Sequence, residues 1–206
     1  MWSYIKNIFK KPEPVAPEPK PIIIEPKPQV TVVPPPPVVK PPAGLPWINV
    51  AQKLLGTDEV PGSGSNPVIV KWAKDMGGFT AKYYTSDDIP WCGLFVGHCI
   101  FEAGIKVTIE NPLYARDWND FGTKCQPCFG AIMVFSRDGG GHVGFYVSED
   151  EDTYHILGGN QSDSVNVTRV AKERLLGARW PTEYMNLMKP GKIVKKFDAK
   201  ISRNEA

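Results

Sequence analysis

Apolar residues recur at helical spacing in three stretches that lie between residues 47 and 104. The first stretch covers residues 48–55 and stops at Gly56, a residue that favours a helix end. The second begins at Asn66, which can cap a helix, followed by a proline that fits the first helical turn. It runs to Gly77. The pattern therefore predicts two short amphipathic helices ahead of a third.

The third helix is predicted over residues 89–103 and ends at Gly104. Asp87 or Asp88 can cap its start, and Pro90 falls in its first turn. These residues place the amino end of the helix just before a cysteine.

After residue 130 the hydrophobic period changes from helical to two, which is typical of strands. The predicted strands cover residues 131–136, 142–148, 153–157, 164–170 and 178–180. The second and third of them form a hairpin around the acidic turn 149–152. Helices followed by antiparallel strands predict an α+β fold, with the helices packed on an antiparallel sheet.

Cys92 is the candidate nucleophile because it lies in the first turn of the third predicted helix. The N–H groups and the dipole at this end favour a thiolate over a thiol. A thiolate is the form that attacks carbonyl carbon. Gly93 beside it is expected to leave room for a substrate. The alternative is that Cys92 is one more small buried apolar residue.

A cysteine nucleophile needs a base, and the sequence has three histidines: His98, His142 and His155. His98 follows Cys92 by six positions on the same helix, so its side chain points elsewhere. His142 opens a predicted strand and shares one face with Gly144 and Tyr146. We expect that face to be open to a substrate and the opposite face to be the core side, so His142 is the candidate base.

The hairpin predicts a partner for His142. If Ser148 pairs with Thr153, His142 lies opposite Gly159, or opposite Asn160 after a one-residue bulge. The amide oxygen of Asn160 can then hold the imidazole in the required tautomer. The alternative is that Asn160 is a turn residue that uses its tolerance of the left-handed conformation.

Cys125 and Cys128 form a lone CxxC motif. Together with His142 and His155 they could assemble a zinc site, but their spacing matches no common zinc pattern. Redox chemistry would require the motif at a helix start after a strand, which the pattern does not predict. We expect no metal and no cofactor.

The rest of the chain falls outside this domain, which we place at residues 47–186. Residues 12–46 hold 14 of the 21 prolines and predict an extended polyproline spacer. Residues 1–11 have the pattern of a short basic amphipathic helix that can lie on a membrane surface, or of a terminus without regular structure. Residues 187–206 predict a basic tail.

The formal net charge of +2 is unevenly distributed. Residues 1–46 and 187–206 carry +3 and +4, so the domain between them carries −5. An acidic domain argues against a nucleic-acid-binding core. No apolar stretch reaches 18 residues and no secretory signal is visible, so we expect a chain made in a cytoplasm without a signal peptide.

Three segments carry a resemblance to a known family. They read PWCGLFVGHCIFEAGI from residue 90, GAIMVFSRDGGGHVGFYVSEDEDTYHILGGNQSDSVNV from residue 130, and LGARWP from residue 176. In this order and spacing they resemble the NlpC/P60 and CHAP superfamily of papain-like cysteine hydrolases, closest to an endolysin-like branch common in phage and bacterial genomes. The resemblance covers roughly residues 47–182.

The resemblance implies a papain-like fold and cleavage of a peptide or amide bond in peptidoglycan. By motif match the catalytic residues would be Cys92, His142 and Asn160, of which the third position varies across the superfamily. The implied enzyme is a cysteine-type endopeptidase or N-acetylmuramoyl-L-alanine amidase that acts at the bacterial cell wall, plausibly as a phage endolysin and as a monomer. The alternatives are a non-catalytic wall-binding or virion structural module on the same fold, and a zinc hydrolase.

Overall fold

The computed structural model describes residues 44–197 and 201–202. This described part begins with helices α1 (Pro46–Lys53), α2 (Pro67–Met76), α3 (Gly78–Tyr83) and α4 (Cys92–Glu102). The strands follow as β1 (Thr123–Lys124), β2 (Ile132–Arg137), β3 (Gly140–Glu149), β4 (Thr153–Gly158), β5 (Asn166–Ala171), β6 (Leu175–Trp180) and β7 (Ile201–Ser202). Short 3-10 helices are η1 (Ala115–Asp120), η2 (Lys172–Arg174) and η3 (Thr182–Leu187).

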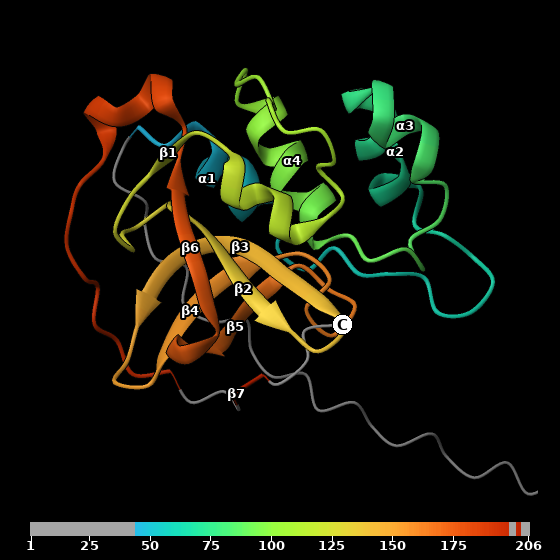
Figure 1. The fold of residues 1–206 in the computed structure, drawn as a ribbon. Helices are drawn as coiled ribbons and strands as arrows, with labels where there is room; N and C mark the ends of the chain where they lie inside the picture. Colours follow the sequence, from blue (N-terminus) through green and yellow to red (C-terminus); the bar gives the residue numbers. More distant parts are fainter. Residues whose placement is uncertain (1–43, 198–200, 203–206) are drawn as a thin grey trace, which may run out of the picture. The chain divides into compact units, whose positions relative to one another are not determined.

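The strands form one sheet in the order β1-β6-β2-β3-β4-β5-β7. Neighbouring strands run antiparallel, except that β5 and β7 are parallel. Helix α4 packs against β3, and α1 and α2 pack against α4 (Figure 1). The predicted α+β class, with helices on an antiparallel sheet, is therefore confirmed.

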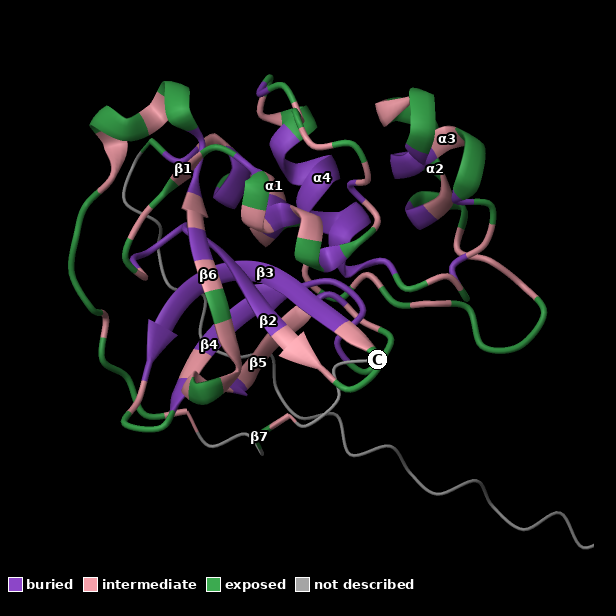
Figure 2. Ribbon diagram, viewed as in Figure 1, coloured by how far each residue is buried: buried purple, intermediate pink, exposed green. Residues whose placement is uncertain are grey.

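Burial concentrates where α4 meets the sheet (Figure 2). The Phe95 ring of α4 meets the Phe145 ring of β3 edge to face at 6.1 Å. On the opposite face of β3, Tyr146 meets Tyr154 of β4 at 5.9 Å. Both faces of β3 are buried from His142 onward, so the expected open face does not exist.

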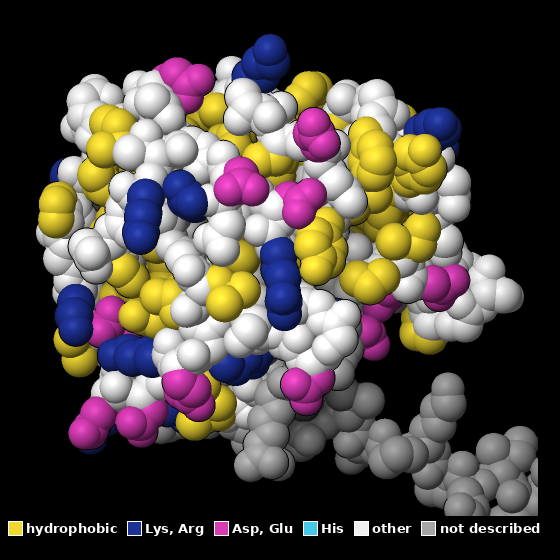
Figure 3. Space-filling view, viewed as in Figure 1, with side chains coloured by type: hydrophobic (Ala, Val, Ile, Leu, Met, Phe, Trp, Pro, Cys, Tyr) yellow, Lys and Arg dark blue, Asp and Glu magenta, His cyan; other side chains and the backbone are white. Residues whose placement is uncertain are grey.

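The surface shown in Figure 3 mixes Lys and Arg side chains with Asp and Glu side chains. The three histidines of the chain are all buried. Any chemistry that a histidine performs here therefore takes place beneath the surface.

The helix predictions were right in position and wrong at some ends. Asn66 caps α2 as predicted, since its side chain accepts from Val68 N at 2.9 Å. Helix α4 begins at Cys92 rather than at residue 89, with Pro90 outside it. Asp87 does not cap α4, because its carboxylate already accepts from the backbone N–H groups of Val60 and Asn66 at 3.0 and 2.8 Å.

The hairpin of β3 and β4 has a different register from the one expected. Ser148 pairs with His155 rather than with Thr153, and the register shifts between Tyr146 and Ser148. The reason lies in the turn, where Asp150 Oδ1 accepts from the backbone N–H of Asp152 and of Thr153. This Asx-type turn closes the hairpin over three residues, and a bulge takes up the difference.

The chain after residue 186 is not only a tail. Glu149 N donates to Ile193 O at 2.8 Å, and Lys195 N donates to Glu149 O at 2.9 Å. The Phe197 ring lies 5.1 Å from the His155 ring, and β7 pairs with β5. Part of the segment predicted as a basic tail, 187–206, thus belongs to the compact domain.

The predicted amphipathic helix 1–11 and nearly all of the spacer 12–46 lie outside the described residues. The described end of the spacer enters the domain, because Leu45 is buried and α1 begins at Pro46. Among the helices that the structure describes, none has both the length and the apolar character needed to cross a bilayer.

Candidate active site

Cys92 is the first residue of α4 and exposes 4% of its surface. The first N–H groups of an α-helix have no acceptor within the helix, so partial positive charge gathers around this residue. The next residue must be glycine, because a Cβ at Gly93 would collide with the carbonyl oxygens of Pro112 and Leu113. The prediction that Gly93 leaves room for a substrate is therefore wrong, because backbone fills the space beside it.

His142 lies near the start of β3, where it pairs with Phe135 of β2, and is fully buried. Its Nε2 lies 2.9 Å from Gln161 Oε1. His142 therefore has an amide partner, as predicted, but the partner is Gln161.

The network around Gln161 fixes which way its amide points. Gln161 Nε2 donates to Ile156 O at 3.2 Å, to Asn166 O at 2.7 Å and to Asn166 Oδ1 at 3.0 Å. With the amide nitrogen committed to acceptors, its oxygen is the atom that faces His142, and His142 Nε2 must carry the proton. The neutral imidazole then has Nδ1 as its basic nitrogen.

Asn160, the predicted third residue, is a turn residue. It has φ 54°, in the left-handed region, and is 5% exposed. If the pairing of Phe145 with Leu157 continued, Asn160 would lie opposite His142, as the bulged alternative predicted. The strand ends at Gly158, however, and the left-handed turn sends the side chain of the next residue, Gln161, back to the imidazole.

Two glycines link this pair to the start of α4. A Cβ at Gly158 would lie 2.7 Å from Gln161 Oε1 and 3.3 Å from His142 Nε2. A Cβ at Gly159 would lie 2.6 Å from both Phe95 Cβ and a ring atom of Trp91. The two-residue segment Gly158–Gly159 is therefore packed between the His142–Gln161 pair and the side chains of Trp91 and Phe95, which precede and follow Cys92 in the sequence.

A second link joins the loop that follows Gln161 to the approach to α4. Glu59 N donates to Asp163 O at 2.8 Å, and the adjacent Val60 N donates to Asp87. The pKa of Glu59 is raised to about 7, first by burial and then by a hydrogen bond and the negative charge of Asp163. Burial alone would raise the pKa of Asp87, but the N–H groups of Asn66 and Val60 bring it below its usual value.

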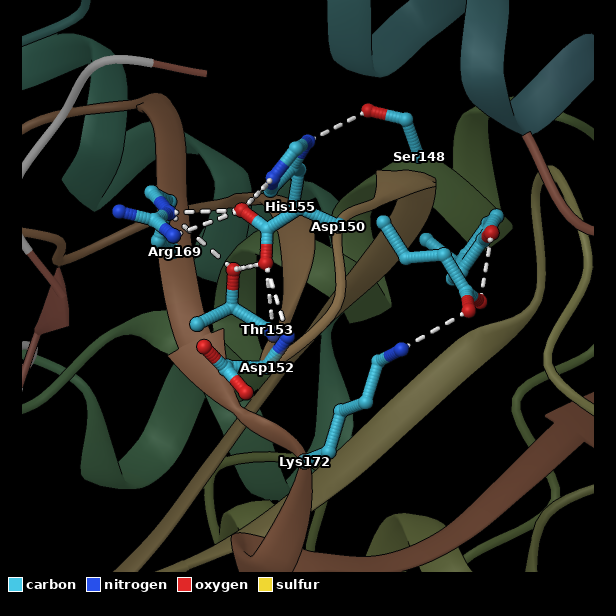
Figure 4. A network of polar contacts seen from close by, with 9 residues as sticks. Ser148, Asp150, Asp152, Thr153, His155, Arg169 and Lys172 are labelled. Carbon is cyan, nitrogen blue, oxygen red and sulfur yellow. Dashed lines mark hydrogen bonds and ion pairs between the residues drawn. The ribbon is translucent and has the colours of Figure 1, made fainter. Parts of the chain in front are cut away.

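The other two histidines are engaged elsewhere. His98 stacks on Trp72 at 5.0 Å, and burial lowers its pKa. His155 Nδ1 lies 2.7 Å from Ser148 Oγ, and its Nε2 lies 3.0 Å from Asp150 Oδ2 (Figure 4). Asp150 also accepts from Arg169, so this network is a closed structural unit between β3, β4 and β5.

The residues named for a zinc site are not assembled into one cluster. Both ring nitrogens of His155 are hydrogen-bonded to Ser148 and Asp150, and His142 is bonded to Gln161. Within the described ranges, no group of three or more His, Cys, Asp or Glu side chains is placed to hold a metal ion.

No family model matches the chain, and no curated protein matches it. The likeness to the NlpC/P60 and CHAP superfamily thus rests on the sequence motifs.

Burial sets a condition on any chemistry at this site. Cys92 exposes 4% of its surface and His142 none. Little of Cys92 is therefore accessible to a substrate carbonyl in this structure. The arrangement is therefore a closed one, with its imidazole already oriented.

Proposed function

We propose that this chain is a papain-like cysteine hydrolase that cleaves a peptide or amide bond of bacterial peptidoglycan. The observation that carries the proposal is the His142–Gln161 pair, in which a buried network holds one ring nitrogen and leaves the other as the base. Imidazole, orienting amide and a cysteine at a helix start are the three parts that such catalysis needs.

The mechanism follows from these roles. His142 Nδ1 takes the proton of the Cys92 thiol, and the sulfur attacks the carbonyl carbon. The N–H of Cys92 at the helix start stabilises the oxyanion. His142 then returns the proton to the leaving amine, which departs and leaves a thioester. Water, deprotonated by the same imidazole, hydrolyses the thioester to a carboxylic acid and the thiol.

The substrate and setting come from the motif resemblance. Peptidoglycan is the proposed partner, with cleavage by an endopeptidase or an N-acetylmuramoyl-L-alanine amidase. A phage endolysin that acts at the cell wall fits both activities. Residues 1–11 are proposed to contact a membrane surface through their basic apolar pattern.

A matched pair of cysteine variants tests the proposal. Cys92→Ser should reduce the release of amines from purified sacculi by about 10³-fold or more, because a hydroxyl is a far weaker nucleophile. Cys125→Ser makes the same change at a half-buried cysteine beside β1 and should keep the activity. Thermal unfolding of both variants checks that they are folded. Full activity in Cys92→Ser would remove the proposal.

A second candidate is a wall-binding or virion structural module without turnover. The burial of Cys92 and His142 favours it, since Cys92 exposes 4% of its surface and His142 none. This candidate predicts that the wild-type protein sediments with sacculi and releases no amines from them. Mass spectrometry of the soluble fragments distinguishes the two functions and identifies the bond that is cut.

A further inference from the structure

A polar cleft of about 790 Å³ lies where η1, η2 and the turn between β2 and β3 come together. Its charged lining residues are three arginines and three acids: Arg116, Arg137, Arg174, Asp138, Asp152 and Glu173. Pockets that bind small molecules usually have volumes of about 300–1,000 Å³ and mostly apolar walls. This cleft therefore has the size of a ligand site, with walls that carry charge of both signs.

Two of the arginines are fastened to the hairpin of β2 and β3. Arg116 Nε donates to Gly140 O at 2.8 Å, and Arg174 Nε donates to Ser136 O, also at 2.8 Å. Arg174 Nη1 donates further to Ser202 O at 3.2 Å. No other described residue accepts a hydrogen bond from Arg116. The backbone thus holds the Arg116 guanidinium through Nε and leaves its terminal nitrogens available as donors.

Arg137 adds a third arginine at the same end of the cleft. It is the last residue of β2 and pairs with Gly140, the residue whose carbonyl holds Arg116. A guanidinium matches a carboxylate in geometry, because two of its N–H groups can donate in parallel to the two oxygens. The end of the cleft at the β2–β3 hairpin therefore fits a carboxylate.

Asp152 and Glu173 bring negative charge to another wall of the cleft. Lys172 N donates to Asp152 O at 3.0 Å, which ties the turn between β3 and β4 to the start of η2. Glu173 is the next residue of η2, and both Asp152 and Glu173 are exposed. A backbone contact therefore keeps the two acids in neighbouring segments, where they can bind a positively charged group.

The charged side chains of the cleft do not neutralise one another in pairs. Five of them make no ion pair with any described residue: Arg116, Arg137, Asp138, Asp152 and Glu173. A simple anion would meet the three acids in this cleft, and a simple cation would meet the three arginines. Like charges brought together in this way weaken binding. A ligand that carries one group of each sign avoids both repulsions.

We propose that this cleft binds a small zwitterion, namely a short peptide with a free carboxylate and a free ammonium group. The carboxylate accepts hydrogen bonds from the arginines at the β2–β3 hairpin, and the ammonium donates to Asp152 and Glu173. Cys92, His142 and Gln161 are not among the described residues that line the cleft. The inference is therefore independent of the proposed function.

Isothermal titration calorimetry on the full chain at pH 7 tests the proposal with the dipeptide alanyl-alanine. Two blocked forms serve as matched probes: N-acetyl-alanyl-alanine lacks the ammonium group, and alanyl-alanine amide lacks the carboxylate. We expect the unblocked dipeptide to bind and each blocked form to bind about tenfold more weakly or worse, because one set of charge-assisted hydrogen bonds is lost. No binding of alanyl-alanine, equal affinity for all three forms, or equally tight binding of inorganic phosphate would overturn the proposal.

Single variants test the two ends of the cleft. Arg137→Gln should remove the preference for alanyl-alanine over its amide, and Glu173→Gln should remove the preference over the N-acetyl form. Lys124→Gln and Glu183→Gln make the same changes of charge at exposed residues outside the cleft and should bind as the wild type does. Cleft variants that bind like the wild type, or controls that lose as much affinity, would contradict the assignment. The wild-type titrations decide the proposal even if one variant fails to fold.

Discussion

Gln161 Oε1 and His142 Nε2 lie 2.9 Å apart, and the amide nitrogen of the same glutamine is bonded to acceptors of β4 and β5. The Gln161 side chain thus links the His142 imidazole of β3 to the neighbouring strands β4 and β5. Removal of this side chain should therefore change the orientation of the imidazole more than it changes the stability of the fold.

Gln161→Ala should lower kcat/KM on sacculus fragments by about 10²- to 10⁴-fold, because the imidazole loses its fixed tautomer. Asn160→Gly is the matched control. Glycine adopts φ 54° at least as easily as asparagine, so this variant should keep its activity and change the free energy of unfolding by less than about 1 kcal/mol. The reverse result, with Asn160→Gly inactive and Gln161→Ala active, would assign the orienting role to Asn160.

Gly158→Ala should damage the same site by crowding. Its Cβ would lie 2.7 Å from Gln161 Oε1, so either the backbone or the amide must move. Overpacking of this kind costs about 1–3 kcal/mol, measurable as a shift in the urea midpoint. Gly140→Ala is the control, since a Cβ there meets nothing within 4 Å. Equal urea midpoints for both variants would show that the segment around Gly158 accommodates the added methyl group without loss of stability.

Asp150 should control stability at low pH. Burial alone would raise its pKa, but hydrogen bonds from His155, Thr153 and Arg169 bring the pKa well below the usual value. A depressed pKa in the folded state means that the stabilisation is complete above about pH 4 and is lost as the pH falls below it. Thermal unfolding at pH 7 and at pH 3 measures this loss.

Asp150→Asn should remove most of that pH dependence and cost about 2 kcal/mol at pH 7, because charge-assisted hydrogen bonds become neutral ones. Asp152→Asn is its control, because that side chain is exposed in the same turn (Figure 4). A wild-type acid transition that persists unchanged in Asp150→Asn would place its origin elsewhere.

Glu59 should have the opposite effect on stability. Its pKa is raised to about 7, first by burial and then by Asp163, so the folded state holds a proton that the unfolded state has already lost. The free energy of unfolding should therefore fall as pH rises from about 4.5 to about 7. Glu59→Gln should flatten this slope, as read from urea midpoints at pH 5 and pH 8. An unaltered slope in the variant would assign it to other groups.

The sequence predicted the elements better than it predicted the contacts between them. Asn66-Pro67 specified the start of α2 because capping is local chemistry. Pro90 was misleading, since it fits a helix start equally well when the helix begins two residues later. The two-residue strands β1 and β7 carry too few residues for any periodic signal.

The unexpected contact of His142 with Gln161 has the same origin. Asn160 and Gln161 are adjacent in sequence, and the left-handed conformation at Asn160 accompanies the contact of Gln161 with His142. An asparagine preceded by two glycines is a signal for such a left-handed turn, so the contact with Gln161 was within reach of turn chemistry. The register shift between Tyr146 and Ser148 could not be predicted from turn residues, because it depends on the whole hairpin.

The two outermost strands, β1 and β7, each have two residues, whereas the strands that they cover, β6 and β5, each have six. A long unpaired edge strand can form backbone hydrogen bonds with the edge strand of another molecule. These two short strands protect the sheet, since they are its edge strands and are too short to pair stably with a strand of another molecule. Loss of the last few residues would remove β7 and expose the edge of β5, which could then pair with β5 of a second chain.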